Sequence, residues 1–137
     1  MKFDGSPVPA TLVQITNITH KDGTPLEAEN RRLKNIGIVT LCWIAGGFNC
    51  LTPFFKSKII LKNNTVLSVD LYWSGNASTG SKLPIETEPG VFEFETNTSI
   101  YQFRILTAEE DALVRTAIKE AIVANIIQQP ENRPPAS

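Results

Sequence analysis

Few side chains in this sequence can catalyse a reaction or bind a metal. His20 is the single histidine, and it stands in a predicted turn beside Asp22 and Gly23. A serine or cysteine nucleophile needs a neighbouring base, commonly histidine, and a histidine in a turn is more often solvated than catalytic. The two cysteines, Cys42 and Cys50, are too few for a four-ligand zinc site. We therefore expect no catalytic residues, no metal and no cofactor.

Two weaker sources of chemistry remain. A disulfide between Cys42 and Cys50 would close a hairpin-like loop, but free thiols are favoured in a chain whose first residues lack an apolar export signal. Glu93 and Glu95 offer paired carboxylates. Because they alternate with large aromatic residues along a predicted strand, a solvated outer face is favoured over an acid–base pair.

The basic residues suit an anionic ligand better. Arg104 lies on a predicted strand beside aromatic residues, where a guanidinium can bind a phosphate with two parallel hydrogen bonds. A cross-strand ion pair with Glu93 or Glu95 is an equally good interpretation. Arg115, on the first half of a predicted helix, is expected beside Arg104. Lys82, at the end of a glycine-containing loop, would add charge if that loop closes over a ligand.

Other candidate ligand-binding residues are aromatic, amide or basic. Tyr101, Phe92 or Trp73 would stack on a planar base of the ligand, although most aromatic residues are expected in the core. Asn97 would form hydrogen bonds with the edge of that base. The basic run of Arg31, Arg32 and Lys34 is typical of a solvated surface. Around the symmetry axis of an oligomer, the same run would be repeated and would form a concentrated anion site.

The elements that must position these residues follow from periodicity and turn signals. Strands are expected at 11–20, 36–44, about 55–62, 65–73, 91–96 and 99–106, the last two joined by a turn at Asn97 and Thr98. Residues 74–82 are small and polar and predict an exposed, mobile loop. Strands followed by one helix indicate an α+β fold, with a bent antiparallel β-sheet or a small barrel before one long C-terminal α-helix.

The helix is expected at 107–129. Thr107 and Glu110 have the spacing of a capping box, and Pro130 ends the segment. Residues 121–127 are apolar nearly all round, whereas a helix on its own sheet needs only one apolar stripe. The excess predicts a homo-oligomer assembled through helix 107–129 and its neighbouring strands.

Composition limits the classes of partner. The chain has 137 residues and a net charge of −1, from 13 basic and 14 acidic residues. Duplex nucleic acid usually demands a strong basic excess, so it is not an expected partner. No run of apolar residues is long enough to span a membrane. We expect a cytoplasmic protein, with a single domain at 1–129 and a disordered tail at 130–137.

Three segments carry a family resemblance: NRRLKNIGIVTLCWIAGG, TVLSVDLYW and FETNTSIYQF. They resemble short β-rich proteins of phages and Firmicutes whose sheet ends in a T-x-[NT]-S-x-Y-x-F strand, here formed by Thr96, Thr98, Ser99, Tyr101 and Phe103. Over about two-thirds of the chain the pattern is similar to the phage anti-Thoeris nucleotide sponges.

That resemblance implies sequestration, without degradation, of a cyclic ADP-ribose isomer made by bacterial immune proteins, and assembly through C-terminal helices. Only the hairpin from Asn97 to Arg104 and the helix with Arg115 are comparable with the family. The expected function is thus a non-enzymatic protein that sequesters a phosphorylated or cyclic nucleotide signal and so evades antiviral defence in the bacterial or phage-infected host cytoplasm. The alternative is a protein-interaction module that inhibits a host protein by docking its aromatic hairpin.

Overall fold

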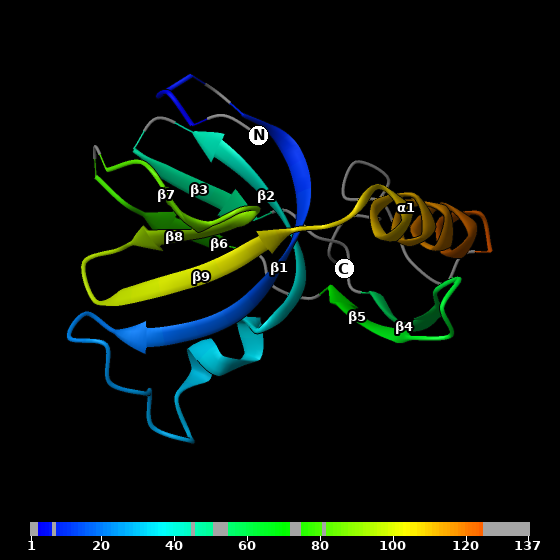
Figure 1. Ribbon diagram of the computed structural model, residues 1–137, viewed down its shortest axis with the longest axis horizontal. Helices are drawn as coiled ribbons and strands as arrows, with labels where there is room; N and C mark the ends of the chain where they lie inside the picture. Colours follow the sequence, from blue (N-terminus) through cyan, green and yellow to red (C-terminus); the bar gives the residue numbers. More distant parts are fainter. Residues whose placement is uncertain are drawn as a thin grey trace, which may run out of the picture.

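The computed structural model describes residues 3–6, 8–44, 46–50, 55–71, 75–80 and 82–124. It has the predicted α+β architecture, an antiparallel sheet followed by one helix (Figure 1). The seven-stranded sheet has the order β6-β3-β2-β1-β9-β8-β7. Its strands are β1 (Val8–His20), β2 (Gly37–Ile44), β3 (Gly47–Cys50), β6 (Gly75–Ser78), β7 (Ile85–Glu88), β8 (Val91–Glu95) and β9 (Ser99–Ile105).

The remaining elements are a hairpin, a short 3-10 helix and the C-terminal helix. Strands β4 (Phe55–Ile60) and β5 (Val66–Leu71) form a separate two-stranded sheet, η1 (Arg31–Asn35) precedes β2, and α1 (Ala108–Val123) closes the described chain. In Figure 1 the hairpin and α1 lie together beside the large sheet. Neither helical segment of the described chain is long and apolar enough to cross a membrane.

The large sheet is strongly bent, but it does not close into a barrel. Phe48 of β3 and Phe94 of β8 have ring centroids 5.0 Å apart, although β2, β1 and β9 lie between their strands in the sheet. Phe3 packs edge-on against Phe48, Phe92 and Phe103 and fills the concave side. Each aromatic pair stabilises the fold by about 0.5–1.5 kcal/mol beyond the effect of burial. This cluster therefore stabilises the bent form of the sheet.

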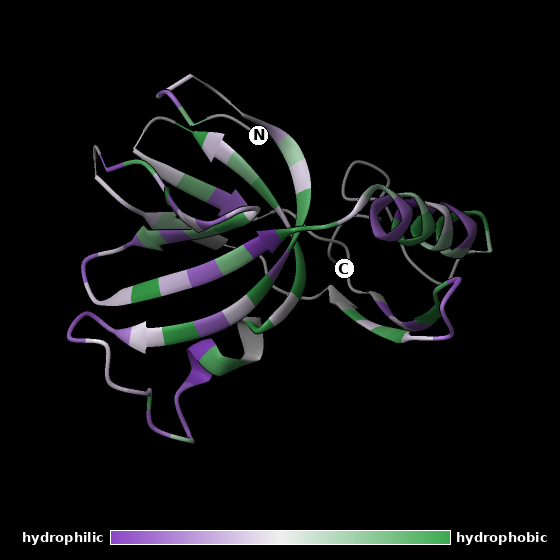
Figure 2. Ribbon diagram, viewed as in Figure 1, coloured by the Kyte–Doolittle hydropathy of each residue, from purple (hydrophilic) through white to green (hydrophobic). Residues whose placement is uncertain are grey.

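A second core joins the helix to the convex side of the sheet. Its buried members are Leu12, Ile38, Leu67, Val69, Leu106, Val114 and Ala121. Ile38 belongs to this core. Its neighbour Val39 belongs to the core that contains Phe3's partners Phe48, Phe92 and Phe103, which we call the aromatic core. Strand β2 is therefore buried on both faces at Ile38 and Val39, whereas Ile44 at its end is exposed. The alternation of hydrophobic and hydrophilic residues is visible along β1 and β9 (Figure 2).

The prediction of an exposed loop at 74–82 is wrong for residues 75–79, whereas Gly80 and Lys82 are exposed and lie outside any strand. Gly75–Ser78 forms β6, which pairs with β3, and Ala77 and Thr79 are buried. A Cβ atom at Gly47 would lie 2.5 Å from the backbone oxygen of Ala77. The two strands approach this closely because Gly47 has no side chain, and small residues therefore indicate tight pairing here rather than mobility.

The helix begins as predicted. Thr107 and Glu110 form the capping box, with each side chain accepting a hydrogen bond from the other's backbone N–H. The described helix ends at Val123, with Ala124 as its C-cap. Residues 125–129, to which the helix was predicted to extend, and the predicted tail at 130–137 lie outside the described residues.

Candidate functional site

Arg104 is part of a clamp between the sheet and the helix. Its Nη1 and Nη2 atoms each donate to a carboxylate oxygen of Glu110 at 2.8 Å, and its Nε donates to Gln14 of β1 at 2.7 Å. The predicted cross-strand partners Glu93 and Glu95 are not involved. Every guanidinium nitrogen thus has a protein partner, and Glu110 occupies the pair of Nη groups that would bind a phosphate with two parallel hydrogen bonds.

The clamp sets the charge state of its members. The hydrogen bonds from Arg104 lower the pKa of Glu110 to about 2, against the opposing effect of burial, and the Thr107 backbone N–H contributes in the same direction. The same pair raises the pKa of Arg104 above its ordinary value. The carboxylate and guanidinium are thus charged together at neutral pH, which fits a structural ion pair.

The predicted stacking residues lie in the aromatic core. Tyr101 is parallel to Phe94, with centroids 4.9 Å apart, and Phe92 stacks on Phe103 at 5.5 Å. Both Tyr101 and Phe92 are buried, so a ligand cannot stack on them without opening the core. Trp73 lies outside the described residues.

Arg32 and the turn at Asn97 meet at one end of the sheet. Nη1 of Arg32 donates to the Thr98 hydroxyl at 3.0 Å and also to the hydroxyl of Ser99, which is fully buried. Arg32 therefore ties η1 to the β8–β9 turn, while Asn97 and Arg31 are exposed there. This is where the structure brings together predicted site residues from distant parts of the sequence.

His20 is engaged with a carboxylate rather than with a nucleophile. Its Nε2 lies 2.9 Å from Glu27, a pair that is partly open to solvent. The pKa of Glu27 is lowered by its own backbone N–H first, then by His20 and Asn30. Cys42 is a free thiol that donates to the Asn49 backbone oxygen, and the side chain of Cys50 lies outside the described ones. In the described chain, no three His, Cys, Asp or Glu side chains gather as a metal-binding group.

Lys82 lies beside a hollow at the β7 end of the sheet. Its ammonium pairs with Glu95 at 2.5 Å, and the hydrogen bond lowers the pKa of that carboxyl. The hollow has a volume of about 400 Å³. Its lining residues are Lys82, Leu83, Ile85, Glu93, Phe94, Glu95 and Ile100. With two carboxylates and one ammonium, the hollow does not favour an anion.

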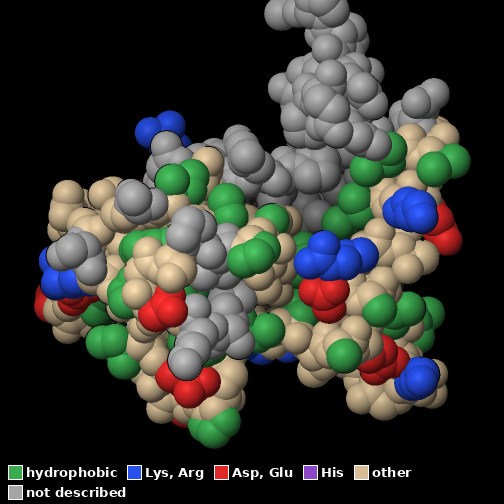
Figure 3. Space-filling model, turned by 90° about the horizontal axis from the view of Figure 1, so that it is seen from above, with side chains coloured by type: hydrophobic (Ala, Val, Ile, Leu, Met, Phe, Trp, Pro, Cys, Tyr) green, Lys and Arg blue, Asp and Glu red, His purple; other side chains and the backbone are tan. Residues whose placement is uncertain are grey.

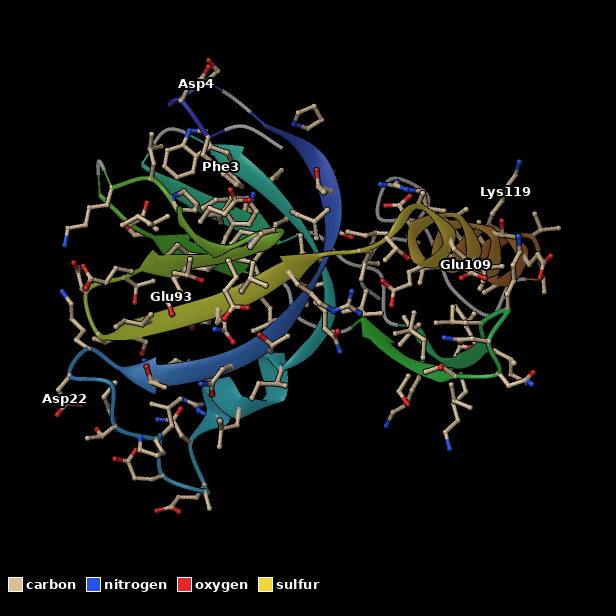
Figure 4. The ribbon with its side chains drawn as sticks, viewed as in Figure 1. Phe3, Asp4, Asp22, Glu93, Glu109 and Lys119 are labelled. Atoms are coloured by element: carbon tan, nitrogen blue, oxygen red, sulfur yellow. The ribbon has the colours of Figure 1, made fainter. Side chains whose placement is uncertain are left out.

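Arg115 borders a different concavity, which we call the helix groove. It has a volume of about 440 Å³ and is lined by Leu12, Thr40, Arg115, Ile118, Lys119, Ile122 and Val123. Nε of Arg115 donates to Asp111 at 2.6 Å, and both Nη groups make no hydrogen bond with a described residue. Lys119, exposed and four residues further along, extends into solvent (Figure 4). Basic side chains lie beside hydrophobic ones on the part of the surface that carries α1 (Figure 3).

Tyr101 and Phe92 thus lie in the aromatic core, and the basic and amide residues of the predicted site fall into four other places. These are the Arg104 clamp, the Arg32 and Asn97 turn, the Lys82 hollow and the helix groove with Arg115. Sequence reasoning missed Lys119, although its spacing of four from Arg115 places both on one helix face. No protein-family model matches the chain, and neither a curated protein nor a solved structure is significantly similar to it.

Proposed function

We propose that this protein binds a small anionic ligand in the helix groove and releases it unchanged. The observation that carries the proposal is the placement of Arg115 and Lys119 at the rim of an apolar floor formed by Leu12, Ile118 and Ile122. Ligand pockets are mostly apolar, with a few polar groups that orient the ligand, and typically occupy about 300–1,000 Å³. The helix groove has both properties.

The chemistry of the groove selects a class of ligand. Arg115 has two Nη groups to offer, and a guanidinium can bind a phosphate or carboxylate with two parallel hydrogen bonds. Lys119 supplies a second positive charge four residues away on the same helix. The apolar floor favours an anion with a less polar body over a bare inorganic ion.

Phosphorylated and cyclic nucleotides, including ADP-ribose-type signals, meet the requirement for an anionic group with a larger body. Their base would lie on the aliphatic floor, because Tyr101 and Phe92 are buried in the aromatic core. Nucleotides of this kind, which the sequence resemblance suggests, are thus the first class to test. Sequestration of such a signal remains the proposed biological role.

The test is a thermal-shift series with cyclic ADP-ribose isomers, cyclic dinucleotides and inorganic phosphate as probes. A ligand at about 100 times its Kd stabilises the folded state by about 2.7 kcal/mol, so Tm should rise for at least one nucleotide. The double variant Arg115→Glu with Lys119→Glu should lose that rise. Lys58→Glu, an exposed charge reversal on β4, should keep it.

Two outcomes would contradict the proposal. One is an unchanged Tm with every probe; the other is an equal Tm rise in the double variant and the parent protein. Mass spectrometry of the ligand recovered after denaturation tests the non-catalytic part. Recovery of a hydrolysed or rearranged nucleotide would show that the protein is an enzyme.

A further inference from the structure

Strand β7 is an edge strand with an exposed surface. Among the described residues it pairs only with β8, and all four of its residues, Ile85–Glu88, are exposed. Ile85 is 69% exposed, which is high for an isoleucine in a sheet. The backbone N–H and C=O groups on the outer side of an edge strand can pair with another extended chain.

The hollow beside Lys82 adjoins this edge. Leu83 and Ile85 enter it from the β7 side, and Ile100 enters from β9. Ile85 pairs with Glu93 in the β7–β8 register, so both side chains lie on the same face of the sheet. A chain added along β7 would therefore direct alternate side chains toward the hollow, where apolar residues lie beside the two carboxylates and the Lys82 ammonium.

The charge of this region decides what kind of chain fits. Four carboxylates lie on β7 and β8: Glu86, Glu88, Glu93 and Glu95. Lys82 offsets one of them directly, and Lys21 acts on Glu95 from further away. A second copy pairing through β7 would bring the same carboxylates against each other, which is unfavourable. A basic chain has the complementary charge.

We propose that β7 and the hollow beside it bind an extended, basic segment of another protein by strand addition. The segment alternates Lys or Arg with apolar residues. Its backbone pairs with β7, and its apolar side chains contact Leu83, Ile85 and Ile100 on the face that carries the hollow. Its basic side chains point to the other face, beside Glu86, and Glu93 attracts them at longer range. The register shift between Glu86 and Glu88 limits the length of regular pairing, so the bound stretch is short.

The experiment uses a fluorescently labelled peptide of eight residues in which lysine alternates with valine, measured by fluorescence anisotropy against the full chain. Saturable binding that weakens with salt is expected. The double variant Glu86→Gln with Glu93→Gln should lower affinity at least about tenfold, equivalent to about 1.4 kcal/mol. Glu120→Gln, on the exposed face of α1, is the matched control and should leave affinity unchanged.

Two further peptides separate the parts of the proposal. A peptide with glutamate in place of lysine should not bind. A lysine peptide methylated on alternate backbone nitrogens keeps its charge but cannot pair as a strand, and it should bind at least about tenfold more weakly. Equal binding of either peptide would overturn the proposal, as would no binding of the lysine peptide or equal losses in the Glu120→Gln control. None of these residues belongs to the helix groove, so the result is independent of the small-ligand proposal.

Discussion

At the scale of single residues, Arg104 shows how a basic residue in a sheet can be structural. Its exposed fraction is 29% and that of the Glu110 side chain is 9%, so the ion pair is largely shielded from water. The types and spacing of the residues predicted an arginine that binds a carboxylate or phosphate. They did not indicate Glu110 as partner, because that contact depends on where the helix begins relative to β9.

Removing Arg104 should therefore destabilise the fold. Arg104→Ala leaves the buried carboxylate of Glu110 without its cation, a loss typically near 3 kcal/mol or more. Chemical denaturation should show this loss of stability as a lower denaturant concentration at the unfolding midpoint. Arg115→Ala removes an exposed i,i+4 pair with Asp111 and should cost no more than about 0.5 kcal/mol. Similar losses in the two variants would contradict the structural role of the clamp.

Glu110 should also make stability depend on pH. Its pKa is about 2 in the folded protein and 4.5 ordinarily. A lowered folded pKa gives stability that is fully present above pH 4.5 and is lost as pH falls toward 2. Urea denaturation at several acid pH values should show a smaller decline for Glu110→Gln than for the parent. Parallel declines would show that other carboxylates, such as the exposed Asp22 and Glu27, account for the acid sensitivity.

At the scale of elements, apolar patterning predicted some strands well and others not at all. The regular alternation at 91–96 and 99–106 predicted β8 and β9, and the strand predicted at 65–73 is present as β5, with Leu67 and Val69 buried. Strand β6 has the sequence GNAS, which carries no apolar alternation, and β7 is exposed on every residue. Both are held by pairing with a neighbouring strand, a property that single-strand patterns do not contain.

The close pairing of β3 and β6 gives a prediction at this scale. Gly47→Ala would place a Cβ atom 2.5 Å from the Ala77 backbone oxygen, so the two strands must separate. Overpacking of this kind typically costs about 1–3 kcal/mol. Thermal denaturation should show a lower Tm for Gly47→Ala, whereas Ser78→Ala on the exposed side of the pair should change little. An unchanged Tm for Gly47→Ala would contradict the close approach of β3 and β6.

The candidate site could be predicted only in part, for a related reason. Arg115 was predicted from its place on the helix, and it does line a groove. Leu12 on β1 and Thr40 on β2 also line that groove, and they lie far from Arg115 in the sequence. The sequence shows that these residues are apolar or small, but only the packing of α1 on the convex face brings them together.

At the scale of the whole molecule, the part formed by α1, β4 and β5 carries exposed apolar side chains. Val123 is 79% exposed, and Ile60 and Val66, which face each other in the hairpin, are 68% and 54% exposed. Ala121 is buried and Ile122 packs against the second core, so part of the apolar stretch at 121–127 is covered within one copy. Ile126 and Ile127 lie outside the described residues.

Oligomerisation through α1 and the adjoining hairpin thus stays a prediction. Burying exposed aliphatic side chains between copies lowers the free energy of the assembly by about 25 cal/mol per Å² of apolar surface removed from water. Size-exclusion chromatography with light scattering should give a mass of at least two copies at micromolar concentration. Val123→Asp should shift that mass toward one copy and leave the fold intact by circular dichroism. A single-copy mass for the parent protein would contradict the prediction.

The central position of β1 has a consequence for synthesis of the protein. Residues 8–20 leave the ribosome before β2 and can pair with it soon afterwards. Their other neighbour, β9, follows some 86 to 90 residues later, in contacts such as Thr16 with Gln102 and Gln14 with Arg104. Until then, β1 has one unpaired edge, and its core residues Val13, Ile15 and Ile18 lack the cover that β9 contributes. The nascent chain should therefore depend on chaperones during translation, and slow codons placed before β9 should lower the yield of folded protein.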